Sequence, residues 1–151
     1  MDNATVRIDE SYMPIVDQVV KTSRLFDLNV KFAVVAALVG FEQQKKANET
    51  NRGTKGEIHA RVFENNEYQG YVYLIAVADT GSPEILREGN DAEIYKIFED
   101  YMNAGFEIIS EWMADNGGDA EATFLKRLEL KVLEVMPSDN GEPHTGAVPK
   151  F

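Results

Sequence analysis

The strongest constraint on the fold is a long run of apolar residues at helical spacing in the second half of the chain. These residues recur at steps of three and four: Ile94, Ile97, Phe98, Tyr101, Ile108, Ile109 and Trp112. Such spacing predicts one amphipathic helix that buries this face against other elements. Gly105 lies in the middle of the face, where glycine costs about 1 kcal/mol of helix propensity relative to alanine. We therefore expect another backbone to cross the helix closely at Gly105.

The rest of the chain also favours helices. Residues 5–8 alternate apolar and polar side chains, which predicts a short strand. Further helices are expected from about residue 9 to 23, from 27 to Gly40, from 65 to 81, and after Asp119, with Gly40 supplying the left-handed residue that ends its helix. The prediction is a mainly α fold of about five helices around one core, with one or two short strands and an N-terminal strand–helix–helix unit like that of ribbon–helix–helix proteins.

The length and local composition predict the domain organisation. A chain of 151 residues suits one domain with a single core. Residues 43–57 lack apolar periodicity and are rich in Lys, Asn, Thr and Gly, which predicts a mobile basic loop. Residues 137–151 contain three prolines and little apolar content. We expect a helical domain over residues 1–136 and a flexible tail over 137–151.

Charge is distributed unevenly along the chain. The net charge is −11, and residues 61–122 account for it, with three basic and fourteen acidic side chains. Residues 1–60 and 123–151 are each balanced. An acidic stretch that follows a cationic loop favours docking on charged partners, because patches of one sign steer association.

Composition excludes several classes of protein. The chain has no cysteine, so disulfides, thiolate metal sites and a cysteine nucleophile are excluded, and a reducing compartment is favoured. The longest apolar run, Phe32 to Phe41, is far shorter than the roughly 20 residues that cross a bilayer. We expect a cytoplasmic protein without a membrane partner.

No motif for catalysis, metal or cofactor binding is present. His59 and His144 lack the neighbours that would form a catalytic triad. The segment Asp115–Glu121 lacks the glycine and the terminal glutamate of a calcium loop. We therefore predict no catalytic residues, no metal site, no cofactor and no enzymatic activity.

Two sets of charged residues are the candidate contact sites. The basic set, a candidate contact for DNA or an acidic partner, comprises Lys45, Lys46, Arg52, Lys55 and Arg61. The acidic set, expected on the solvent face of the long helix and a candidate contact for a basic partner protein, comprises Glu93, Glu99, Asp100, Glu107 and Glu111. Each set would act through charge complementarity.

The N-terminal strand offers an alternative contact with DNA. In ribbon–helix–helix repressors, strands paired across a dimer lie in the major groove. On this interpretation Thr5, Arg7 and Asp9 would face the bases, although the acidity of the chain disfavours phosphate contact. A structural strand that pairs within the domain or across a dimer explains the same apolar residues.

Four segments read together resemble a known bacterial family. These segments are Arg7–Tyr12, Ala36–Phe41, Leu74–Leu86 and Ile97–Ile109. In order and spacing they resemble the DNA phosphorothioation-associated protein 4 family, also called Dnd system-associated protein 4, over residues 6 to about 135. The resemblance implies an accessory protein encoded with systems that place sulfur in the DNA backbone and restrict unmodified DNA. It implies no catalytic residues, and it carries a contact role to Lys45, Lys46 and Arg52.

The sequence therefore predicts a non-enzymatic accessory or adaptor protein of a bacterial anti-phage defence system. Its partners would be other proteins of that system, with DNA contact through the basic loop as a further role. Two alternatives stay open: a small dimeric DNA-binding protein, and an acidic DNA mimic that inhibits restriction. Homodimer formation is part of the first alternative.

Overall fold

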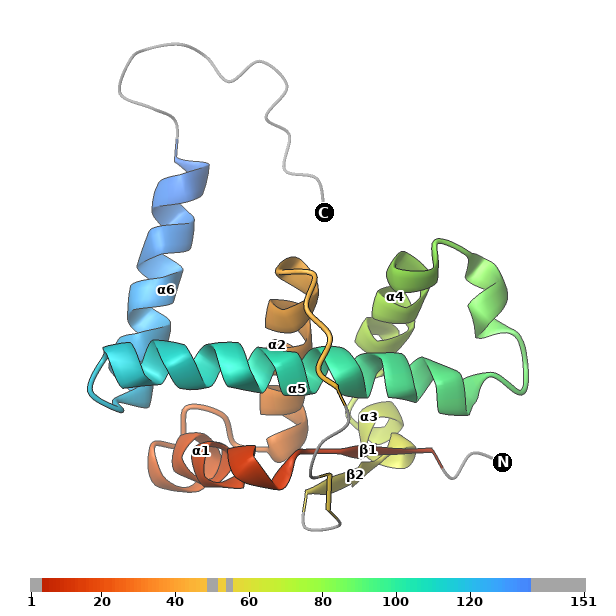
Figure 1. Ribbon diagram of the computed structural model, residues 1–151, viewed down its shortest axis with the longest axis horizontal. Coiled ribbons are helices and arrows are strands. Elements are labelled where there is room, and N and C mark those ends of the chain that lie inside the picture. Colours follow the sequence, from red (N-terminus) through yellow and green to blue (C-terminus); the bar gives the residue numbers. More distant parts are fainter. Residues whose placement is uncertain (1–3, 49–51, 54–55, 137–151) are drawn as a thin grey trace.

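The chain is mainly helical, as predicted, in the computed structural model, which describes residues 4–48, 52–53 and 56–136 (Figure 1). The described residues form six α-helices, one more than expected: α1 Met13–Asp17, α2 Asn29–Glu42, α3 Ala60–Asn65, α4 Gln69–Thr80, α5 Asp91–Asp115 and α6 Ala120–Val135. The shorter elements are η1 Glu10–Tyr12, η2 Gln18–Thr22, η3 Pro83–Leu86 and the strands β1 Thr5–Arg7 and β2 Glu57–His59. The predicted tail 137–151 lies outside the described residues, as do 49–51 and 54–55 of the predicted loop.

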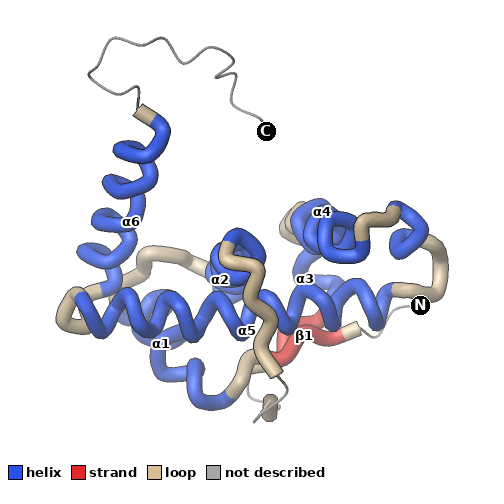
Figure 2. Tube along the Cα trace, turned by 45° about the horizontal axis from the view of Figure 1, so that its top comes forward, coloured by secondary structure: helices blue, strands red, loops and turns tan. Residues whose placement is uncertain are grey.

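Helix α5 runs through the body of the molecule, and α2 crosses it closely (Figures 1 and 2). A Cβ added at Gly105 would lie only 1.7 Å from the backbone oxygen of Ala36 on α2. One added at Gly40 would lie 2.1 Å from the backbone oxygen of Tyr101 on α5. The crossing predicted from Gly105 is therefore confirmed, and each helix contributes a glycine to it.

The end of α2 differs from the prediction. Gly40 does not terminate the helix, which continues to Glu42, and the left-handed residue beyond it is Gln44 at φ 55°. Gly40 lies inside the helix because the crossing with α5 requires a residue without a side chain there. Phe41 follows it and packs edge to face on Tyr101, with ring centroids 5.3 Å apart.

Aromatic rings fill the core on both sides of α5. Phe106 of α5 packs edge to face on Phe32 of α2, with ring centroids 5.1 Å apart. Phe98, further along α5, makes the same kind of contact at 5.1 Å with Phe63 of α3. All four side chains are fully buried, so α5 joins the N-terminal helices to α3 and α4 through one continuous core.

Strand β1 is paired on both of its edges. On one edge it forms an antiparallel ladder with β2, in which Val6 lies opposite Ile58. On the other edge, Glu99 Oε1 accepts from the Arg7 amide at 2.6 Å, and Asn103 Oδ1 accepts from the Asp9 amide at 2.8 Å. The strand expected at the N-terminus is confirmed, and its partner strand belongs to the same chain.

Helix α6 packs on the core through its first turn. It projects away from the body (Figures 1 and 2), and of its residues only Ala120 and Thr123 are buried. Phe124 is partly buried and packs edge to face on Phe26 and Phe32. Beyond this first turn, the apolar side chains of α6 are exposed.

Candidate functional site

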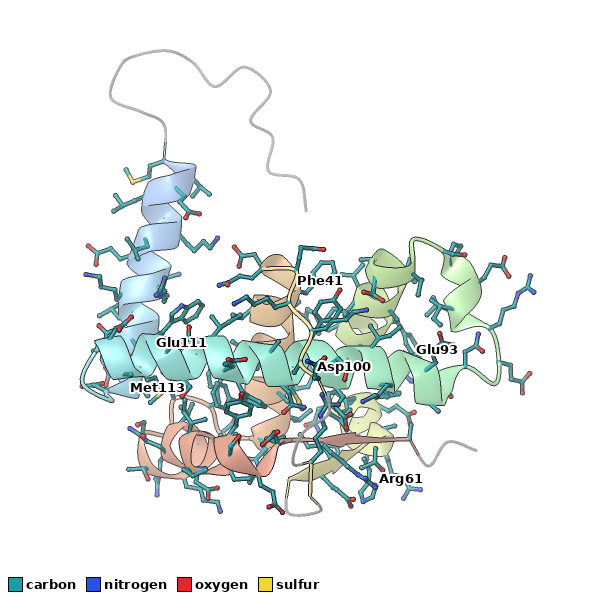
Figure 3. The ribbon with its side chains drawn as sticks, viewed as in Figure 1. Phe41, Arg61, Glu93, Asp100, Glu111 and Met113 are labelled. Atoms are coloured by element: carbon teal, nitrogen blue, oxygen red, sulfur yellow. The ribbon has the colours of Figure 1, made fainter. Side chains whose placement is uncertain are left out.

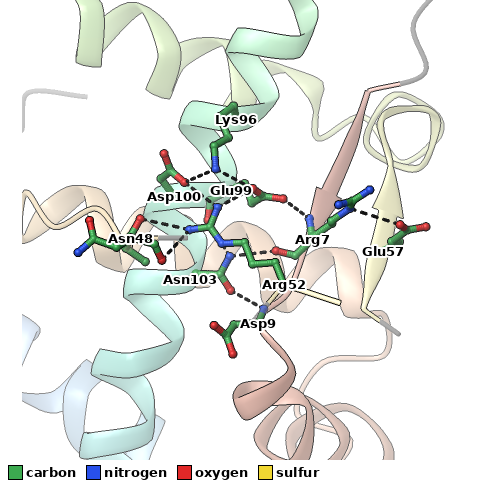
Figure 4. Close-up of polar contacts among 10 residues, drawn as sticks. Arg7, Asp9, Asn48, Arg52, Glu57, Lys96, Glu99, Asp100 and Asn103 are labelled. Atoms are coloured by element: carbon green, nitrogen blue, oxygen red, sulfur yellow. Dashed lines mark hydrogen bonds and ion pairs between the residues drawn. The ribbon is translucent and has the colours of Figure 1, made fainter. Parts of the chain in front are cut away.

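The described part of the segment between α2 and β2, residues 43–48, 52–53 and 56, contacts the outer side of α5 through Ala47 and Arg52. We call it the α2–β2 loop. Its Lys45 amide donates to the Gly40 carbonyl at 2.9 Å, and its Ala47 amide donates to the Asp100 carbonyl of α5 at 2.9 Å. Residues 52–53 continue it on the same side of α5 (Figure 4). The candidate basic set and the candidate acidic set therefore meet within one molecule.

Arg52 anchors this loop to α5 (Figure 4). Its Nη1 lies 2.6 Å from Glu99 Oε2 and 2.8 Å from Asp100 Oδ1. Its Nη2 donates to the Ala47 and Asn48 carbonyls at 3.1 and 3.3 Å. The Arg52 side chain is 6% exposed and that of Glu99 is 7% exposed, so this pair is almost fully removed from water.

Lys96 completes a four-residue ion-pair cluster with Arg52, Glu99 and Asp100. Its Nζ lies 3.3 Å from Glu99 Oε2 and 3.2 Å from Asp100 Oδ1. Burial lowers the pKa of Arg52, but the hydrogen bonds and charges of Asp100 and Glu99 outweigh it and raise that pKa above its ordinary value. Two cations and two carboxylates leave the cluster neutral, as buried charges require.

A second contact holds the loop to α4 through Lys46. The Nζ of Lys46 lies 2.8 Å from Asp79 Oδ1 and 5.3 Å from the centre of the Tyr101 ring. The Tyr101 hydroxyl donates to the same carboxylate at 2.6 Å. Burial raises the pKa of Asp79, but the hydrogen bonds and charge from Lys46 and the Tyr101 hydroxyl have the larger effect. The pKa of Asp79 is therefore below its ordinary value. Burial and then Asp79 raise the pKa of Tyr101 to about 12.

The five predicted basic residues do not form one exposed patch. Arg52 is buried in the ion-pair cluster, and Lys46 is paired with Asp79. Lys45 is exposed on the loop, and Arg61 is exposed on α3, away from Asp100 (Figure 3). Lys55 lies outside the described residues. A contact with DNA or an acidic partner stays a prediction for all five residues.

The predicted acidic face is interrupted at its centre. Glu99 and Asp100 do not lie on an open solvent face, because the ion-pair cluster engages both. Glu93 and Glu111 are exposed toward opposite ends of α5, with Asp100 between them (Figure 3). Glu107 is exposed one helical turn before Glu111, and neither forms an ion pair with the described residues. Only the two exposed parts of the set are open to a partner.

Glu107 and Glu111 form an exposed acidic pair beside Tyr12 of η1. Burial raises the pKa of the Tyr12 phenol, and the negative charges of Glu107, Asp9 and Glu111 add to the rise. Both carboxylates are exposed and lie four residues apart on one face of α5, so the acidic pair presents its charge to solvent. A cationic surface is the natural complement of such a pair.

Sequence reasoning missed three residues of the site. Asn103 binds the backbone of β1, Asp79 binds Lys46, and Lys96 completes the ion-pair cluster. One signal could have found the pairing between the two sets. A basic loop followed by a stretch with excess acidic residues fits ion pairs between the two segments of one chain as well as it fits contact with charged partners.

The described residues contain no group of three or more His, Asp or Glu arranged to hold a metal ion. None of the helices in this part of the chain combines the length and apolar character needed to cross a membrane.

The fold and the ion-pair cluster define a small, mainly α protein in which Arg52 of a basic loop is paired with two carboxylates of the central helix. The family model described as DNA sulphur modification system-associated protein 4 matches residues 6–137, so the chain belongs to that family. The resemblance predicted from four sequence segments is thereby confirmed. The comparisons with curated proteins and with solved structures found no match.

Proposed function

We propose that this protein is a non-enzymatic adaptor of a bacterial anti-phage defence system that modifies DNA with sulfur. The family description supports association with such a system. The adaptor binds another protein of the system through the exposed acidic pair, Glu107 and Glu111. It acts in the cytoplasm, on the partner that restricts or modifies DNA.

The contrast between the two charged sets carries this proposal. Two of the five cations predicted to contact DNA, Arg52 and Lys46, are paired with carboxylates within the molecule. Glu107 and Glu111 are exposed and make no ion pair with the described residues. Binding to DNA depends on cations that neutralise phosphates, so this distribution favours a basic protein surface as the partner.

The alternative that β1 reads DNA as in a ribbon–helix–helix repressor is less well supported. Such a protein pairs its strands across a dimer, but β2 and α5 occupy both edges of β1. Asp9, which would face the bases, is buried, and its carboxylate accepts from the Ser11 amide as a helix cap. These contacts favour a structural role for the strand.

Charge reversal of the acidic pair tests the adaptor. We expect Glu107→Lys with Glu111→Lys to lower recovery of the partner about tenfold in a pull-down from cells that express the neighbouring defence genes. The control reverses the same number of charges at exposed positions elsewhere, Glu64→Lys with Glu88→Lys. Wild-type recovery should also fall as salt is raised, because screening weakens exposed charge pairs.

Two outcomes would contradict the adaptor. One is a wild-type pull-down that recovers no protein of the system. The other is a salt-sensitive gel shift by the purified protein that is abolished by Lys45→Ala with Arg61→Ala, which would establish direct DNA binding instead. If the wild-type protein competes with DNA for a purified restriction partner, it acts as a DNA mimic.

A further inference from the structure

The outer part of α6 carries an apolar surface that the rest of the described chain does not cover. Six of its side chains and that of Met136, the residue that follows it, are 41–79% exposed: Leu125, Leu128, Leu130, Val132, Leu133, Val135 and Met136. A helix of this length is marginal in water without tertiary contacts. The buried residues of α6 lie in its first turn, so a partner that covers the exposed apolar side chains would stabilise the remaining turns.

A groove lies along the inner side of α6. It encloses about 780 Å³ between α6 and the side chains of α2 and α5, including Val35, Val39 and Trp112. Lys131 of α6 pairs with Glu42 of α2, and the Arg127 guanidinium lies 4.2 Å from the centre of the Trp112 ring. The groove therefore has apolar walls, with polar contacts that hold α6 in its projecting position.

The apolar surface includes a seam that is suited to pairing with another helix. Leu125, Leu128, Val132 and Val135 are separated by steps of three, four and three residues, the spacing of a coiled-coil interface. A seam of identical residues on two copies can form a symmetric, self-complementary interface.

Helix α6 differs in net charge from residues 61–119, which precede it. Residues 61–119 carry three basic and thirteen acidic side chains, whereas α6 carries three of each. Two copies can therefore approach through α6 without the repulsion that their acidic bodies would create. DNA, which is attracted by an excess of cations, gains nothing from this neutral helix.

We propose that α6 is a dimerisation helix, and that the α6 of a second copy packs antiparallel along the seam. A parallel pair would bring two acidic bodies together at one end. An antiparallel pair places them at opposite ends of helices about 24 Å long, well beyond the screening length of about 8 Å at physiological ionic strength. The proposal does not depend on the adaptor function.

The mass of the full chain in solution tests this interface. Light scattering at micromolar concentrations should give twice the chain mass of 16.9 kDa for the wild-type protein. We expect Leu128→Glu to raise the dissociation constant of the dimer at least about 100-fold, because an unpaired charge would be buried at the seam. The control is Leu74→Glu on α4, since Leu74 is 64% exposed and Leu128 is 62% exposed.

A monomeric wild-type protein would overturn the proposal. So would a dimer that Leu128→Glu leaves intact, or one that Leu74→Glu disrupts equally. Circular dichroism of both variants confirms that the body is folded. Because both substituted residues are already exposed, neither change disturbs the core.

Disulfide trapping tests the direction of the two helices. The chain has no cysteine, so single cysteines can be placed at will. When Leu128→Cys protein is mixed with tagged Val132→Cys protein and oxidised, antiparallel packing should give mostly the mixed disulfide. A predominance of the two symmetric disulfides would indicate parallel packing and contradict the proposed arrangement.

Discussion

Replacing Gly105 with alanine is expected to reduce the free energy of unfolding by about 3 kcal/mol or more. Alanine alone would favour the helix by about 1 kcal/mol relative to glycine. The added Cβ, however, would lie 1.7 Å from the Ala36 backbone oxygen, so α2 and α5 would have to separate. The clash exceeds the gain in propensity because the opposing atom is backbone in a packed core and cannot rotate away.

Gly70→Ala is the matched control for this change. Gly70 also lies in a helix, but a Cβ there would meet nothing within 4 Å. Its substitution should be neutral or stabilise by up to about 1 kcal/mol. Urea unfolding of both variants measures the difference, and equal stability of Gly105→Ala and the wild type would show that the two helices are not in such close contact.

Replacing Arg52 with alanine is expected to cost about 3 kcal/mol of stability. Removing one partner of a buried ion pair leaves the other charge without compensation, which typically costs about 3–5 kcal/mol. Lys96, 3.3 Å from the same Glu99 oxygen, remains and places the expected loss near the lower end. The carbonyls of Ala47 and Asn48 would also lose a donor, so the α2–β2 loop should detach from α5.

Two measurements separate this effect from a general loss of charge. Lys45→Ala, in the same loop but exposed, should change stability by no more than about 0.5 kcal/mol. The Ala47 amide, bonded to Asp100 in the wild type, should exchange its hydrogen faster in Arg52→Ala but not in Lys45→Ala. If Arg52→Ala unfolds at the same denaturant concentration as the wild type, the ion-pair cluster does not stabilise the fold.

The role of Arg52 also affects how a test of DNA binding is designed. A variant that neutralises Arg52 together with Lys45 and Lys46 would lose binding through destabilisation as well as through any lost contact. Lys45 and Arg61 are exposed, so their substitution changes surface charge with little effect on packing. They are therefore the residues with which to examine contact with nucleic acid.

Local patterns in the sequence were sufficient for most of the secondary structure. The apolar spacing of residues 94–112 and the glycine within it predicted α5 and its close crossing, and both are confirmed. The prediction for Gly40 was wrong, because a glycine near a helix end can serve either as a cap or as a contact. The sequence pattern is the same in the two cases, and only the position of α5 distinguishes them.

The candidate site was only partly predictable. The sequence identified Arg52, Glu99 and Asp100 as charged residues of interest, but it placed them on two separate surfaces. In the structure they bind one another across 47 and 48 residues of chain. No periodicity in the sequence encodes a pairing over that separation.

What the sequence determined by itself was the helical class, the N-terminal strand, the close contact at Gly105 and the family. These depend on backbone geometry and side-chain spacing within a few residues, which the order of residues specifies directly. The tertiary structure decided which charges are neutralised within the molecule and which apolar face is left open on α6. Both depend on which distant segments come into contact, and the free energy of burying a charge or an apolar side chain is set by those neighbours.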